Sequence, residues 1–156
     1  MNKELVKDFQ TRIVNAGRGE LLIINYEMLL AQINDAIDAV EEDSEEEFGK
    51  AMINAHKLLR ELSSGLDFQY DISKELMSIY IYVNKKLISA SISQNVIDLR
   101  EASKILDVLL QGWKLTEYEE EPPIITNGQK IYAGLTYGRN NLNEMVETEP
   151  NRGYRA

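Results

Sequence analysis

Few side chains in this sequence belong to the types that carry catalytic chemistry or bind metal ions, apart from its carboxylates. A carboxylate-bridged metal site in a helical bundle uses Glu-x-x-His pairs on facing helices. The one histidine, His56, has Ile53 at the position where that glutamate would stand. A Ser/His/Asp triad has only this histidine to use, and the sequence contains no glycine-rich phosphate-binding motif. We therefore expect a protein that is not an enzyme and that needs no metal and no cofactor.

Six acidic residues lie close together between positions 41 and 47. An EF-hand loop places its oxygen ligands at alternate positions and has a glycine at its centre, and this run has neither feature. Acidic side chains in the first turn of a helix interact favourably with the helix dipole. A helix that begins near residue 45 explains the run without a calcium ion.

The overall composition excludes several functional classes. The chain has 156 residues, of which 44% are hydrophobic, and its net charge is −9. Nucleic-acid binding needs clustered Lys and Arg, so this charge argues against it. There is no cysteine, which excludes disulfides and thiolate metal sites. No apolar run approaches the length of about 20 residues that spans a bilayer. We expect a soluble, cytoplasmic protein that binds no nucleic acid and does not insert into membranes.

The hydrophobic residues recur at alternating steps of three and four, which is typical of one face of a helix. One such stripe runs from Phe48 to Leu66 and another from Leu99 to Trp113, and no stretch of comparable length alternates at every second residue. No proline occurs before Pro122, so no helix is interrupted from within. The pattern predicts helices over 3–15, 19–41, 45–66, 72–91 and 94–117.

Residues at the expected helix ends support these boundaries. Ser44 and Glu47 form a capping box, Ser93 is a candidate N-cap for the last helix, and Gly65 is expected to end the third helix in a left-handed conformation. Because the connections are short, neighbouring helices should be antiparallel. The predicted fold is all-α: an antiparallel four-helix bundle with a short extra N-terminal helix and a mostly irregular C-terminal tail. We divide the chain into a bundle domain, 1–121, and an extension, 122–156, that is either flexible or a docked linear segment.

Two of the expected helices are more apolar than a surface helix requires. A second row accompanies the main stripe of 19–41, and 72–91 adds aromatic residues to its own. Either these helices lie centrally, or one row forms a groove for a partner helix. For the second alternative, the candidate contacts are Leu21, Ile24, Met28, Tyr80 and Tyr82. Without a partner, the groove would be filled by segments of the chain itself, around Phe9 and Ile13 or around Tyr132, Leu135 and Tyr137.

Four groups of residues occur in order along these helices: Ala16, Gly17, Glu20-Leu21 and Asn25-Tyr26-Glu27; Asn54-Ala55, Leu58-Leu59 and Glu61-Leu62; Ile72, Leu76, Ile79-Tyr80 and Tyr82; and Leu99, Leu109 and Trp113. In type and spacing they resemble the FliS family of flagellin export chaperones. The resemblance covers roughly residues 10 to 115. The sequence departs from the family pattern at Gly17-Arg18, Met28, Ser91 and Phe9.

The resemblance implies a cytoplasmic chaperone that binds the disordered C-terminal segment of flagellin. Such a protein prevents premature polymerisation and helps to deliver flagellin to the export gate of the flagellar apparatus. A disordered client can lay amphipathic helices into the grooves of a bundle, at a cost in ordering. The alternative is a regulatory or scaffold bundle that binds another amphipathic partner.

Overall fold

A computed structural model describes residues 1–120 of the protein, with side chains described as far as Thr116. It contains five helices over these residues: α1 (Lys3–Asn15), α2 (Arg18–Glu41), α3 (Glu45–Ser64), α4 (Asp71–Ser93) and α5 (Val96–Glu120). The predicted all-α class is confirmed, and no predicted boundary differs from the observed one by more than three residues. The expected tail and the proposed extension, 122–156, lie outside the described residues.

The helix ends agree with the sequence in part. The Ser44 hydroxyl accepts a hydrogen bond from the Glu47 N–H, 3.4 Å away, as expected of an N-cap. The cap expected at Ser93 is wrong, because α4 continues through this residue and the Asn95 side chain instead accepts from the Ile97 N–H, at 2.8 Å. Gly65 ends α3 with φ at −85°, so the left-handed conformation expected there is also wrong.

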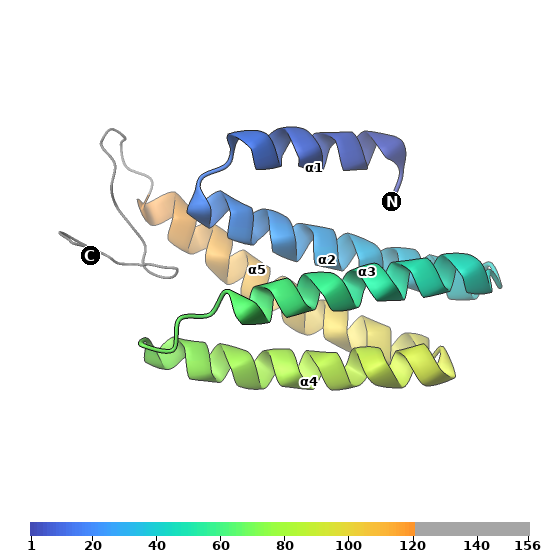
Figure 1. Cartoon of the computed structure of the whole chain (residues 1–156). Coiled ribbons are helices and arrows are strands. Elements are labelled where there is room, and N and C mark those ends of the chain that lie inside the picture. Colours follow the sequence, from blue (N-terminus) through green and yellow to red (C-terminus); the bar gives the residue numbers. More distant parts are fainter. Residues whose placement is uncertain (121–156) are drawn as a thin grey trace.

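Helices α2 to α5 form a four-helix bundle in which α2 and α4 stand at opposite corners. Both of these helices pack against α3 and α5, whereas α2 and α4 face each other only diagonally across the core. Successive helices run in opposite directions (Figure 1). Arg100 of α5 pairs with Glu41 of α2, and Lys114 pairs with Glu27, each at 3.4 Å. These two ion pairs show how α5 is aligned along α2. Helix α1 lies outside the bundle, along α2 (Figure 1).

The core runs through the bundle along the stripes that the sequence predicted. It contains Leu29 and Ile33 of α2, Ala55 of α3, Val83 and Leu87 of α4, and Leu99 and Leu106 of α5, all fully buried. None of the five described helices combines the length and the apolar character that crossing a bilayer requires.

A pair of tyrosines joins the opposite corners of the bundle. The hydroxyls of Tyr26 on α2 and Tyr80 on α4 are hydrogen-bonded at 2.5 Å, and their ring centroids lie 6.4 Å apart. Burial disfavours the charged phenolate and raises the pKa of Tyr26 to about 12. Each buried hydroxyl therefore has the hydrogen-bond partner that burial demands.

Candidate partner-binding site

The second apolar row of α2 lies on the side of the helix that faces α1. Glu20, Ile24, Glu27 and Asp35 follow each other at helical spacing, so they share one face. Two residues of the N-terminal segment pair with this face. The Arg12 guanidinium contacts Glu27 at 2.7 Å and Glu20 at 3.4 Å, and the terminal amino group pairs with Asp35. Helix α1 therefore covers the outer face of α2.

Two side chains are buried between these helices. Phe9 of α1 and Ile24 of α2 are both buried, and neither belongs to the main core cluster. Because Ile24 lies between Glu20 and Glu27 on the face that binds Arg12, α1 is the element that shields it from solvent. Leu21 and Met28 flank this face: Leu21 is 39% exposed, and Met28 is half-buried against the core. The predicted residues of α2 thus form one apolar strip, partly under α1.

The contact between α1 and α2 combines ion pairs with a small apolar patch. The hydrogen bond to Glu27 is the main cause that raises the pKa of Arg12, and the guanidinium carbon also lies 5.8 Å from the Phe9 ring centroid. Glu27 also forms an ion pair with Lys114 of α5. Ion pairs that remain partly exposed contribute only about 0–1 kcal/mol each. Since Phe9 is the one buried residue of α1, α1 is held by far less apolar area than the helices of the bundle.

The predicted contacts on α4 lie elsewhere. Tyr80 is buried in the core beside Tyr26, whereas Tyr82 is 45% exposed. The Tyr82 ring lies 5.4 Å from Nζ of Lys86, which pairs with Glu101 of α5 at 2.6 Å. Tyr82 thus lies near the edge between α4 and α5. Because α2 and α4 occupy opposite corners, the structure does not bring the five predicted contacts together on one surface.

The segments predicted to occupy the groove are placed only in part. Phe9 is buried against α2, and Ile13, one turn further along α1, is 38% exposed. Tyr132, Leu135 and Tyr137 lie outside the described residues. The position of Phe9 is consistent with a segment of the chain that shields the apolar strip of α2.

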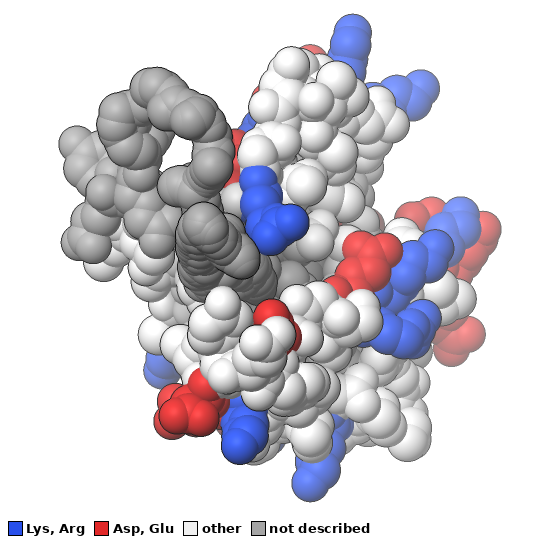
Figure 2. Space-filling view, turned by 60° about the vertical axis from the view of Figure 1, so that its left-hand side comes forward, with Lys and Arg blue, Asp and Glu red and all other residues white. Residues whose placement is uncertain are grey.

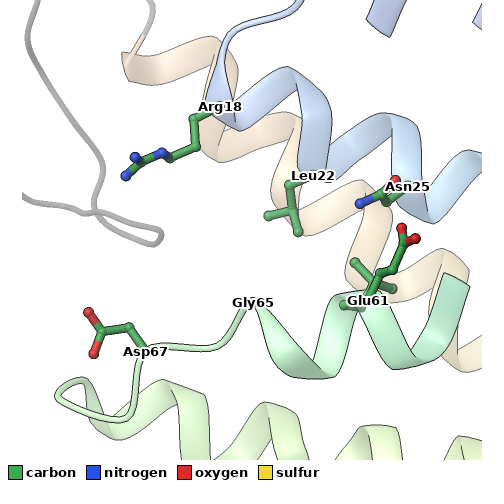
Figure 3. A pocket seen from close by; sticks show the side chains of 7 residues that line it. Arg18, Leu22, Asn25, Glu61, Gly65 and Asp67 are labelled. Carbon is green, nitrogen blue, oxygen red and sulfur yellow. The ribbon is translucent and has the colours of Figure 1, made fainter. Parts of the chain in front are cut away.

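A pocket of about 360 Å³ lies between the start of α2 and the end of α3. Arg18 and Asp67 stand at its mouth, whereas Asn25 and Glu61 face each other at its inner end (Figure 3). Leu22 and Leu62 supply its apolar wall. This end of the bundle is turned forward in Figure 2, where uncharged residues form much of the visible surface and charged ones stand in small groups.

The sequence contained a signal for this pocket that motif searching does not detect. Arg18 and Asp67 each follow closely on a glycine at a predicted helix boundary. In an antiparallel pair of helices, the start of one lies beside the end of the other. The predicted topology therefore places these residues at the same end of the bundle, although no motif joins them.

The fold and this surface define a class of structure: a four-helix bundle with an apolar strip on α2 that lies partly under an additional N-terminal helix. The chain matches the family model of the flagellar protein FliS over residues 1–120. It is also similar to the flagellar secretion chaperone FliS of Bacillus subtilis (strain 168), with 27% identity over 105 residues, or 67% of this chain and 79% of that protein. The chain belongs to the FliS family, a family of chaperones and not of enzymes.

Proposed function

We propose that this protein acts in the cytoplasm as an export chaperone for flagellin, by binding the C-terminal segment of flagellin before assembly. The observation that supports the proposal most strongly is the apolar strip of Leu21, Ile24 and Met28 on α2, which lies partly under a helix held by ion pairs and by one buried side chain of its own. An amphipathic client helix has the apolar face that such a strip binds. Binding would mask the client surface that packs in a filament, and the complex could then be delivered to the export gate.

Displacement of α1 is part of this proposal. Ile24 is fully buried, so a client helix reaches it only when α1 moves away. The cost of that movement is the loss of partly exposed ion pairs and the exposure of Phe9 and Ile24, which is less than the cost of opening the core of the bundle. Arg12 and Phe9 would then compete with the client for one face of α2.

Calorimetric titration of the full chain with a peptide of the flagellin C-terminal segment tests the proposal. We expect saturable one-to-one binding with a negative heat-capacity change, because apolar surface is buried. Leu21→Ser with Met28→Ser should weaken binding by about tenfold or more, since each loses part of an apolar contact worth about 1.5–3 kcal/mol. Val108→Ser, at an exposed apolar position of α5, is the matched control and should change little.

A substitution in α1 tests whether this helix competes with the client for the face of α2. Arg12→Gln removes the cation that pairs with Glu20 and Glu27 while keeping a side chain of similar length. If α1 competes with the client, this variant should bind the peptide a few-fold more tightly than the parent chain. Weaker binding by Arg12→Gln would show that α1 is part of the client site. No binding by any form would remove flagellin as the client.

A further inference from the structure

The pocket between α2 and α3 has a form suited to one large side chain and its neighbours. Its volume of about 360 Å³ lies at the lower end of the range of ligand pockets, about 300–1,000 Å³. Leu22 and Leu62 give it an apolar wall, and Arg18, Asn25, Glu61 and Asp67 surround that wall with polar groups. A tyrosine fits this chemistry well, because its ring is apolar and its hydroxyl needs a hydrogen-bond partner.

The register of α5 places the start of the remaining chain near this pocket. Lys114 lies opposite Glu27 on α2, and Arg100 lies opposite Glu41, so the two helices are aligned over this length. Continued to its end, α5 brings Glu120 to the level of Leu21 and Leu22, one of which lines the pocket. The residues after Glu120 therefore leave the bundle at the end where the pocket opens.

The sequence after Glu120 has the charge and the side chains to occupy the pocket. The whole net charge of −9 falls on residues 1–120, because 121–156 contain four acidic and four basic residues. From 122 to 143 the only charged residues are Lys130 and Arg139, both basic. Lys130 immediately precedes Ile131 and Tyr132. A basic, aromatic segment thus follows an acidic bundle whose pocket carries Glu61 and Asp67.

We propose that residues 130–137 dock in this pocket, with the Tyr132 ring against Leu22 and Leu62 and Lys130 beside Glu61 and Asp67. Chain length permits the contact. The twelve residues from Glu120 to Tyr132 span up to about 40 Å when extended, whereas a helix is only about 10–12 Å wide. The site is separate from the strip of Leu21, Ile24 and Met28, so it does not depend on the identity of the client.

The absence of cysteine allows a direct test in the full chain without client. Ala133→Cys carries a nitroxide label, and its paramagnetic broadening is recorded on the backbone amide signals of ¹⁵N-labelled protein. We expect strong broadening at Asn25, Glu61 and Gly65 and none at the turn between α2 and α3, at the other end of the bundle. Broadening confined to another face, or to no part of residues 1–120, would overturn the proposal.

Matched variants identify the anchoring residue. Tyr132→Ser in the labelled chain should lower the docking equilibrium constant about tenfold or more, since a buried aromatic ring contributes about 1.5–3 kcal/mol. Tyr137→Ser should reduce it less, and Lys130→Glu should reduce it more than Arg139→Glu does. If Tyr132→Ser leaves the broadening unchanged, Tyr132 is not the anchor and the proposal fails. These substitutions lie outside the bundle, so its folding is retained.

One mixing experiment separates contact within one chain from contact between two. Protein that carries the nitroxide but contains no ¹⁵N is mixed with ¹⁵N-labelled protein that has no nitroxide. Docking within one chain predicts no broadening in this mixture. Broadening at the pocket in the mixture would show that the segment binds a second copy, which overturns the intramolecular contact proposed.

Discussion

The centre of the bundle and the contact between α1 and α2 are held together by different forces. At the centre, fully buried side chains from four helices meet, and the polar pair Tyr26 and Tyr80 satisfies its own hydrogen bonds. At the α1 contact, Phe9 and Ile24 are buried beneath partly exposed ion pairs of Arg12. Burial of apolar area is not weakened by electrostatic screening, whereas exposed ion pairs are screened by salt. The bundle can therefore stay folded while its cover moves.

The largest effect is expected from a change in the centre. Leu106→Ala on α5 removes a fully buried side chain and leaves a cavity, so we expect the free energy of unfolding to fall by about 2–5 kcal/mol. Val108→Ala on the same helix, at a residue that is 68% exposed, should change it by about 0.5 kcal/mol or less. Urea denaturation followed by circular dichroism measures both values. Similar losses for the two variants would contradict the described core.

An effect of intermediate size should appear in alkaline solution. Burial raises the pKa of Tyr26 to about 12 in the folded protein, above its ordinary value of about 10. The folded state therefore holds its proton where the unfolded state has lost it. The contribution of Tyr26 to the free energy of unfolding is fully present below pH 10 and is lost as the pH rises towards 12. A shift of two units corresponds to about 3 kcal/mol.

Variants isolate this contribution from other alkaline effects. Tyr26→Phe removes the titrating hydroxyl, so its unfolding free energy should decline less steeply between pH 10 and 12 than that of the parent chain. Tyr82→Phe changes an exposed tyrosine of α4 and should follow the parent curve. The measurement is urea denaturation at a series of pH values. Parallel curves for all three proteins would show that Tyr26 does not titrate in this way.

The fold was predictable from the sequence because helical periodicity and the absence of internal proline are local properties. The helix caps were less predictable. Ser93 and Asn95 both have side chains suited to capping, and only the point at which α4 ends decides which of them caps α5. Periodicity also showed that α2 and α4 have wide apolar rows. It could not show what covers each row, since that depends on packing between distant elements.

Three residues illustrate this limit. Ile24, Tyr80 and Tyr82 were predicted together as partner contacts, yet Ile24 is shielded by α1, Tyr80 is bonded to Tyr26 in the core, and Tyr82 is exposed near α5. All three belong to apolar rows on their helices, so the pattern treats them alike. The pocket could not be predicted for the same reason. Arg18 and Asp67 are 49 positions apart in the sequence, and only the antiparallel packing of α2 and α3 brings them together.

The smallest effect on overall stability, and the most specific to the cover, is expected from Arg12→Gln. Loss of partly exposed ion pairs should lower the free energy of unfolding by about 1 kcal/mol or less. Amide hydrogen exchange should nevertheless become faster throughout α1, and raised salt should have the same effect on the parent chain, because both weaken the attachment to Glu20 and Glu27. Lys50→Gln is the control, since within residues 1–120 Lys50 pairs with Glu46 and Glu47 of its own helix and with no residue of α1. If exchange in α1 becomes faster only together with exchange in the whole bundle, in step with global unfolding, α1 and the core form one cooperative unit.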